Sequence, residues 1–240
     1  MAVIQNEIAQ YANWYHRIEV SRGIFTPGTH DSQHQLAFMD AEVGFPKNCS
    51  GMRILDLGVR DGFFSFEMER RGAREVVGVD YVPPDKTGFH IASKLLGSKV
   101  QYVTDNVYNI SKAKYGTFDI VLFLGILYHL RNPIYVMDRL REVTNDGGLL
   151  FVETQMATDP SVDKLVTPAW QYFPSDSFNN DGSNKWAPNL AAMKAMASDC
   201  LYEPLIAKPY FTRGYLTAKA TSNEKNEHFK KADYSIGMWG

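Results

Sequence analysis

Cysteine is scarce in this sequence, and the scarcity narrows the class of protein. The 240 residues include two cysteines, Cys49 and Cys200, which lie far apart in the chain. Small secreted domains that depend on disulfides carry many more, so no disulfide framework is indicated. No C-x-x-C pair and no G-x-S-x-G nucleophile motif occurs. We therefore predict neither a metal site nor a serine nucleophile of that type.

Long apolar runs and an excess of charge of one sign are also missing. No run of about 18 apolar residues occurs, so no segment is expected to cross a membrane. Polar residues interrupt the opening segment, which does not resemble a signal peptide. The 25 basic and 27 acidic residues give a net charge of -2, which makes nucleic acid an unlikely partner on charge alone. We expect a soluble, cytoplasmic protein, and nothing in the sequence indicates its oligomeric state.

The middle of the chain alternates short apolar runs with helical stretches. The apolar runs, rich in Val, Ile and Leu, cover 53–57, 75–80, 100–103, 118–123 and 149–154. Helices are predicted over 64–71, 87–96 and 133–143, the last one beginning with Asn132 as the cap and Pro133 in the first position. Strands that are apolar on both faces and joined by helices predict a Rossmann-like, doubly wound α/β sheet with helices on both faces.

The segments that flank this repeat differ from it. Residues 1–48 are predicted to form a helical cap, because the apolar residues of the first twenty positions follow the spacing of one helical stripe. These residues are Ile4, Ile8, Tyr11, Tyr15 and Ile18. Residues 155–187 interrupt the repeat with an aromatic insert that we interpret as a lid, within a catalytic domain spanning 49–220. A helix over 189–197 and strands over 202–207 and 215–220 follow, and a polar tail spans 221–240.

The end of the first predicted strand carries the first candidate site. Asp56, Gly58 and Gly62 lie where this strand turns into a helix, the place where an open α/β sheet brings backbone amides to a nucleotide-like ligand. Asp80 ends the second strand, and a carboxylate there can accept hydrogen bonds from both ribose hydroxyls of an adenosine. A dinucleotide dehydrogenase also has an acid here, but its turn needs G-x-G-x-x-G. This turn reads G-V-R-D-G-F, with Arg60 in place of the middle glycine.

These motifs resemble those of class I S-adenosylmethionine-dependent methyltransferases. The resemblance rests on RILDLGVRDGFFSFEMERRGAREVVGVD, FDIVLFLGILYHLRNP and GGLLFVET, between about Gly51 and Thr154. It is greatest to members with a G-x-L-Y-H-L-x-x-P segment, which include small-molecule methyltransferases and the tRNA wobble-uridine carboxymethyltransferase. The resemblance implies a seven-stranded, mostly parallel sheet whose last strand, 215–220, is antiparallel, and it implies S-adenosylmethionine as the cofactor.

The resemblance also implies roles for individual residues. Asp56, Gly58 and Gly62 would surround the methionine part of the cofactor, and Asp80 would bind the ribose. The other cofactor contacts that it implies are Tyr81 near the adenine, Asp105 at the adenine amino group, an adjacent backbone amide of Asn106 or Val107, and Leu124 and Gly125 beneath the cofactor. Arg60 departs from the pattern. Its side chain either points to solvent or pairs with a carboxylate of the cofactor or substrate.

The two candidate catalytic residues, Tyr128 and His129, follow the fourth predicted strand. His129 is the candidate base for a hydroxyl or ammonium acceptor, because its ordinary pKa of about 6.5 suits proton removal at neutral pH. The alternative is that His129 only orders the turn, and Tyr128 is either an aromatic wall or a cofactor contact. The candidate acceptor-binding residues are Tyr15, His30, Trp170, Tyr172, Phe178 and Trp186.

Three functions remain open at this point. The first is methyl transfer to oxygen or nitrogen of a small-molecule acceptor, by in-line displacement beneath the aromatic insert. The second is an RNA-modifying methyl or carboxymethyl transferase that acts on tRNA. The third is a catalytically silent cofactor-binding protein, suggested by the missing middle glycine.

Overall fold

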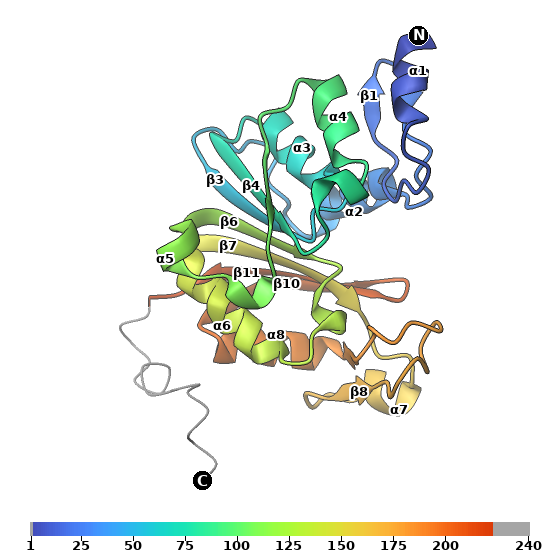
Figure 1. Ribbon diagram of the computed structural model, residues 1–240. Coiled ribbons are helices and arrows are strands. Elements are labelled where there is room, and N and C mark those ends of the chain that lie inside the picture. Colours follow the sequence, from blue (N-terminus) through green and yellow to red (C-terminus); the bar gives the residue numbers. More distant parts are fainter. Residues whose placement is uncertain (1, 223–240) are drawn as a thin grey trace.

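A seven-stranded sheet forms the centre of the molecule in the computed structural model, which describes residues 2–222 (Figure 1). Its strands are β3 (Arg53–Leu57), β4 (Glu75–Asp80), β5 (Gln101–Thr104), β6 (Phe118–Leu124), β7 (Thr144–Gln155), β10 (Tyr202–Tyr210) and β11 (Arg213–Ala220). Their order in the sheet is β10-β11-β7-β6-β3-β4-β5. The strands from β3 to β7 pair in parallel, whereas β11 is antiparallel to both of its neighbours. The predicted fold class, including its antiparallel last strand, is confirmed.

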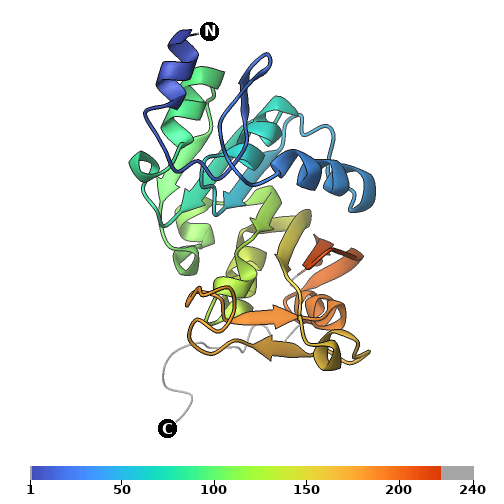
Figure 2. The same ribbon diagram turned by 90° about the vertical axis from the view of Figure 1, so that its right-hand side faces the viewer.

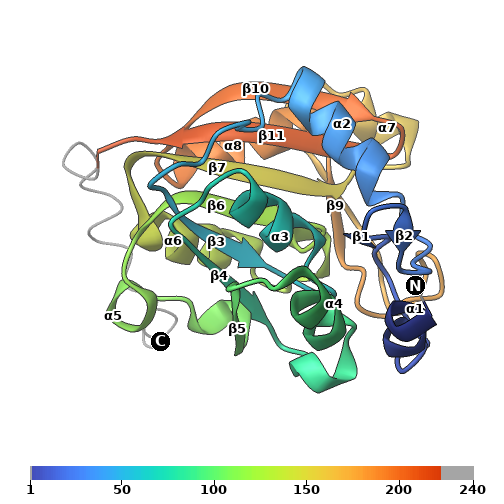
Figure 3. The same ribbon diagram turned by 90° about the horizontal axis from the view of Figure 1, so that it is seen from above.

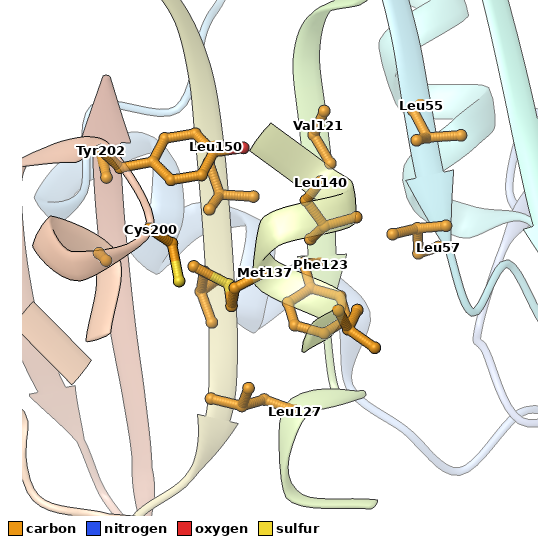
Figure 4. Close-up of a cluster of buried hydrophobic side chains, with 14 of the residues drawn as sticks. Leu55, Leu57, Val121, Phe123, Leu127, Met137, Leu140, Leu150, Cys200 and Tyr202 are labelled. Carbon is orange, nitrogen blue, oxygen red and sulfur yellow. The ribbon is translucent and has the colours of Figure 1, made fainter. Parts of the chain in front are cut away.

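Helices cover both faces of the sheet, as the view from above shows (Figure 3). One face carries α2 (Ser32–Glu42), α3 (Phe63–Arg70) and α4 (Phe89–Leu96), and the other carries α5 (Lys112–Tyr115), α6 (Pro133–Val143) and α8 (Leu190–Asp199). Successive strand residues point to opposite faces, so Ile54 packs in the core beneath α3 while Leu55 packs beneath α6. Figure 4 shows this second core, in which Met137 and Leu140 of α6 lie near Leu150 of the sheet. Two buried cores therefore hold the strand ends in place.

Short helical turns connect several strands. They are η1 (Pro84–Lys86), η2 (Val107–Asn109) and η3 (Leu127–His129). Helix α6 begins at Pro133 as predicted, although the Asn132 side chain makes no capping hydrogen bond. A proline in the first helical position lacks only an N–H that has no partner within the helix, so α6 begins there without a side-chain cap.

The helix predicted over the first twenty residues is wrong beyond Ile8. Helix α1 covers Ala2–Ile8, and the chain then extends into a short hairpin of β1 (Glu19–Ser21) and β2 (Ile24–Phe25). From residue 13 to residue 20 burial alternates, so that Trp14, His16, Ile18 and Val20 are buried. Alternation with a period of two is typical of extended backbone. The predicted helical cap is thus a mixed segment of two helices and a hairpin.

The aromatic insert contains a small sheet of its own. It includes α7 (Pro160–Asp163), and β8 (Trp170–Tyr172) pairs antiparallel with β9 (Trp186–Pro188). Figure 2 shows this ribbon at one end of the molecule. Most of the predicted polar tail, residues 223–240, lies outside the described residues. Within residues 2–222, no helix has the length and apolar character needed to cross a membrane.

Candidate functional site

A cavity of about 1260 Å³ opens at the carboxyl ends of the parallel strands. Its walls come from the ends of β3, β4, β6 and β7, from the amino-terminal segment and from the aromatic insert. The sheet order reverses between β3 and β6, and open α/β sheets bind ligands at such a switch point. The predicted residues that line the cavity are Tyr15, His30, Asp56, Gly58, Arg60, Asp80, Tyr81, Asp105, Asn106, Leu124, Gly125, Tyr128, His129 and Phe178.

The turn after β3 is held in left-handed backbone conformations. Gly58 and Gly62 have φ of 76° and 98°, and Arg60, in place of the expected middle glycine, has φ of 52°. A β-carbon on Gly62 would lie 2.5 Å from Phe66 and 2.8 Å from Phe89. Gly62 does not line the cavity. It is needed for the close approach of α3 and α4 and not as a direct wall of the site.

Arg60 is exposed at the mouth of the cavity. Its guanidinium lies 5.5 Å from the ring centroid of Tyr15, which stacks on the His30 ring at 4.8 Å. No ion pair of Arg60 is found within residues 2–222. The side chain therefore leaves the cavity open and presents an unneutralised positive charge at its entrance.

Asp80 is buried at the end of β4. Its two carboxylate oxygens accept hydrogen bonds from the backbone N–H groups of Arg60 and Val82, each at 2.9 Å. Each carboxylate oxygen has further acceptor capacity, so the group can still bind a ligand hydroxyl. Tyr81, the next residue, is 77% exposed and borders the same wall.

Asp56 lies buried beside the same turn. Its carboxyl accepts a hydrogen bond of 2.6 Å from the Ser65 hydroxyl. Burial raises its pKa to about 7, and the nearby Asp80 charge adds to this effect, while the Ser65 hydrogen bond opposes it. Asp56 therefore exchanges a proton near neutral pH, next to the turn that the motif singled out.

Asp105 is already bonded on both oxygens. One oxygen accepts from the Asn106 backbone and the Asn109 amide, and the other accepts from Lys114 and Tyr115. Burial opposes ionisation, but these hydrogen bonds hold its pKa well below the usual range. A bond to an adenine amino group would have to share or replace one of these four.

The sequence reasoning missed Asp61. This residue is 1% exposed, and its carboxylate accepts three backbone N–H groups: Tyr15 at 2.7 Å, His16 at 2.9 Å and Gly88 at 2.8 Å. It therefore ties the extended amino-terminal segment to the turn after β3 and to the start of α4. The only signal in the sequence was its place inside the D-L-G-V-R-D-G run.

The opposite wall of the cavity begins at η3. His129 Nδ1 lies 2.9 Å from the hydroxyl of Ser183 in the insert, and that hydroxyl lies 2.6 Å from a carboxylate oxygen of Asp181. Burial lowers the pKa of His129, whereas the Asp181 charge opposes that shift. The backbone of η3 is also fastened, because the Lys185 N–H donates to the Tyr128 carbonyl at 2.8 Å.

A partly buried ion pair lies beside Tyr128. Arg213 of β11 donates to both oxygens of Glu153 on β7, and its guanidinium lies 4.7 Å from the Tyr128 ring centroid. Burial opposes the charge of Arg213, but the Glu153 hydrogen bonds raise its pKa. Arg213 and Glu153 were also missed, because they come from strands 60 residues apart.

Two buried polar atoms on the cavity walls have no hydrogen-bond partner among the described residues. They are His16 Nδ1 and Asn184 Oδ1. Buried polar atoms are normally satisfied, so these two atoms are exceptions among the residues that line the cavity.

Three of the expected acceptor contacts do not line the cavity. Trp170, Tyr172 and Trp186 belong to the β8–β9 ribbon, where the Tyr172 and Trp186 rings lie 4.9 Å apart. Strand pairing directs these rings toward one another, and the intervening loop supplies Phe178 to the cavity instead. Their contact with the acceptor therefore stays a prediction that the cavity lining does not support.

The histidines at the mouth have protein partners. His30 Nε2 lies 2.9 Å from the Gln35 side chain, and His34 Nδ1 lies 2.6 Å from Asp31. Across residues 2–222, no group of three or more His, Cys, Asp or Glu side chains is arranged to hold a metal ion.

Comparison with known proteins places this geometry in a family. The sequence model of a family described as a methyltransferase domain matches residues 32–193, more than half of the chain. The tRNA U34 carboxymethyltransferase of Campylobacter hominis is 31% identical over 126 residues, which are 52% of this chain and 43% of that protein. A ubiquinone biosynthesis O-methyltransferase of Hahella chejuensis is 28% identical over 149 residues, 62% of this chain and 60% of that protein. The matching stretches span less than two thirds of these relatives.

A solved structure extends the likeness over nearly the whole chain. The N-terminal domain of EvdMO1, crystallised in the presence of SAH and D-fucose, superposes with a TM-score of 0.63 at 18% identity. The superposition covers 92% of this chain and 96% of that one. At this level of identity, the likeness shows the shared fold.

Proposed function

Because this chain belongs to the class I S-adenosylmethionine-dependent methyltransferase family, we propose that it methylates an oxygen or nitrogen atom of a small molecule. The observation that carries the proposal is the continuous cavity that joins Asp80 and Gly58 to His129. One wall has the groups that the family motif predicts for the cofactor, and the other has a candidate base. A volume of about 1260 Å³ is enough for the cofactor and a small acceptor together.

The cofactor fits the wall formed by β3 and β4. Asp80 retains acceptor capacity for ribose hydroxyls, and the positive charge of Arg60 offers a site for the carboxylate of the amino-acid arm. A β-carbon at Gly125 would meet only the Glu153 side chain, at 3.7 Å, so this position leaves open space at the end of β6. When bound, the cofactor supplies a methyl group on a sulfonium that leaves as a neutral thioether.

The chain's own residues then have two tasks, which are orientation of the acceptor and removal of its proton. His129 borders the cavity, and its lowered pKa keeps the ring neutral and able to accept a proton at pH 7. Phe178 and the Tyr128 ring supply apolar walls for the acceptor. Closing these walls over the acceptor excludes competing water.

Cofactor binding and turnover are tested separately. Isothermal titration calorimetry with S-adenosylhomocysteine is expected to show one site, and absence of binding would contradict the assignment of the cavity. A screen of hydroxyl- and amine-bearing small molecules, read out by homocysteine release through a coupled hydrolase, is then expected to identify an acceptor. His129→Ala should lower that turnover by about 10²- to 10⁴-fold without changing S-adenosylhomocysteine affinity. Complete lack of turnover with every acceptor would favour the catalytically silent alternative.

A second candidate function is methyl or carboxymethyl transfer to tRNA. It is favoured by the likeness to the Campylobacter hominis enzyme, and Arg60 at the cavity mouth can pair with an extra carboxylate. A small-molecule acceptor is favoured by the near-neutral overall charge and by the ion pair that neutralises Arg213. Salt-dependent tRNA binding together with a carboxylated cofactor in mass spectra of the purified protein would decide for the second candidate.

A further inference from the structure

The loop between β8 and β9 reaches back to the candidate base through hydrogen bonds. Two contacts join it to η3: the Lys185 N–H bonds the Tyr128 carbonyl at 2.8 Å, and the Ser183 hydroxyl lies 2.9 Å from His129 Nδ1. Asp181 closes the turn, since the same carboxylate oxygen accepts from the Ser183 backbone N–H at 2.8 Å and from its hydroxyl at 2.6 Å. Hydrogen bonds between side chains therefore connect Asp181 through Ser183 to His129.

The direction of these hydrogen bonds follows from the number of protons. An ionised Asp181 can only accept, so the single proton of the Ser183 hydroxyl is directed to Asp181. The hydroxyl oxygen is then the acceptor toward the ring, and Nδ1 of His129 must carry the proton. The Ser183 backbone also hydrogen-bonds the ring and favours its protonated form. With Nδ1 engaged by the Ser183 hydroxyl, Nε2 is the unprotonated nitrogen that can meet a ligand.

We propose that Asp181 and Ser183 are positioning residues that hold His129 in the Nδ1–H tautomer, so that Nε2 is the atom that accepts the proton of the methyl acceptor. The proposal rests on the proposed function for its chemical meaning. As the bond from the acceptor oxygen or nitrogen to the methyl group forms, the bond from sulfur to that methyl breaks. The acceptor proton moves to Nε2, and the new imidazolium donates from Nδ1 to Ser183 while Asp181 stabilises its charge.

Several charged groups act on the His129 ring. Asp181 favours its protonated form, and Arg213 of β11 disfavours it, although Glu153 of β7 partly neutralises Arg213. The centroids of the Tyr128 and His129 rings lie 4.0 Å apart, and Lys185 donates from Nζ to the Ser175 carbonyl at 3.5 Å. Among the charged groups that shift the pKa of His129, Asp181 is therefore the acidic group on the insert.

The tautomer can be measured without the cofactor or any acceptor. The 240-residue protein with ¹⁵N-labelled histidine is examined by long-range ¹H–¹⁵N NMR, and the His129 signals are assigned by their loss in His129→Gln. Wild type is expected to show a protonated Nδ1 and an unprotonated Nε2. Ser183→Ala should move the ring toward the Nε2–H tautomer that a free histidine side chain prefers, and Ser183→Thr, which keeps a hydroxyl, should retain the wild-type pattern.

A second pair of variants separates charge from hydrogen bonding. Asp181→Asn keeps an acceptor oxygen but removes the charge, so the tautomer should persist while the pKa of His129 falls in an NMR pH titration. Asp176→Asn removes the same charge from the same loop at a position that does not line the cavity, and it should leave both readouts unchanged. A wild-type Nε2–H tautomer, or an unchanged tautomer in Ser183→Ala, would overturn the proposal.

These outcomes are independent of the test of the proposed function. If NMR gives the Nδ1–H tautomer but His129→Ala transfers methyl groups at the wild-type rate, the positioning stands and the assignment of the base fails. If His129→Ala is inactive but the wild-type ring is Nε2–H, the base stands and the positioning by Asp181 and Ser183 fails.

Discussion

The cavity wall beside β3 and β4 and the wall at η3 are named the cofactor wall and the acceptor wall after their proposed ligands, and they are held by different kinds of contact. Beside β3 and β4, Asp61 and Asp80 are buried carboxylates that accept backbone N–H groups from neighbouring segments. At η3, by contrast, exposed Ser183 and Asp181 reach His129 through side-chain hydrogen bonds from a long loop. Buried bonds to the backbone resist change, whereas exposed bonds from a loop are open to variation. This difference suits a fold that keeps one cofactor and changes its acceptor.

The largest expected effect of breaking the cofactor wall is that of Asp61→Asn. The asparagine NH₂ group donates, so at least one of the three bonded N–H groups loses its acceptor in a buried place. We expect unfolding in urea to show a loss of about 2–3 kcal/mol. The matched change on the acceptor wall, Asp181→Asn, should stay within about 0.5 kcal/mol because that carboxylate is exposed. Equal losses in the two variants would remove the distinction between the walls.

Asp80→Asn tests the same wall through cofactor affinity. The neutral amide has one acceptor oxygen in place of two, so it cannot serve Arg60, Val82 and a ribose as the carboxylate does. We expect the Kd for S-adenosylhomocysteine to rise about 10- to 100-fold, measured by calorimetry. Asp85→Asn, an exposed change on η1, is the control and should bind as wild type. Undiminished affinity in Asp80→Asn would contradict the ribose assignment.

Asp56 makes the stability of the cofactor wall depend on pH. Its pKa is raised in the folded protein to about 7, so the folded state binds more protons than the unfolded state above the ordinary value of about 4. Stability contributed by this protonated group is therefore full below about pH 4 and is lost as the pH rises toward about 7. Urea unfolding across this window should show a downward slope that is smaller in Asp56→Asn. An identical slope in both proteins would argue against the shift.

The smallest expected effect concerns the residue in place of the middle glycine. Arg60 holds φ of 52°, a conformation that costs about 1–2 kcal/mol for a residue with a β-carbon. Arg60→Ala and Arg60→Gly both lose the contact with Tyr15, but only glycine removes the strain. We expect the free energy of unfolding, measured in urea, to be about 1 kcal/mol higher for the glycine variant than for the alanine variant. The reverse order would mean that the backbone strain is not significant.

The sequence by itself determined the frame of this protein. The first and last residues of β3 and β4 are those of the predicted apolar runs. A strand that is buried on both faces requires apolar residues along its whole length, and such a run is visible in the sequence. The positions of Asp80 and of the turn that follows β3 were also predicted from the sequence, since parallel strands bring their carboxyl ends to one edge of the sheet. Even the left-handed turn was indicated, through its two glycines.

Only the tertiary structure decided what meets across the cavity. The segment after Ile8 is extended because Asp61, more than forty residues away, accepts its amides, and no helical stripe in the sequence reveals that. Trp170 and Trp186 turn toward each other because their strands pair, while Ser183 comes to His129 from 54 residues away. Local pattern reflects which side of an element is buried. Partners distant in the chain are selected by packing and hydrogen bonding in three dimensions, and these contacts set the acceptor wall.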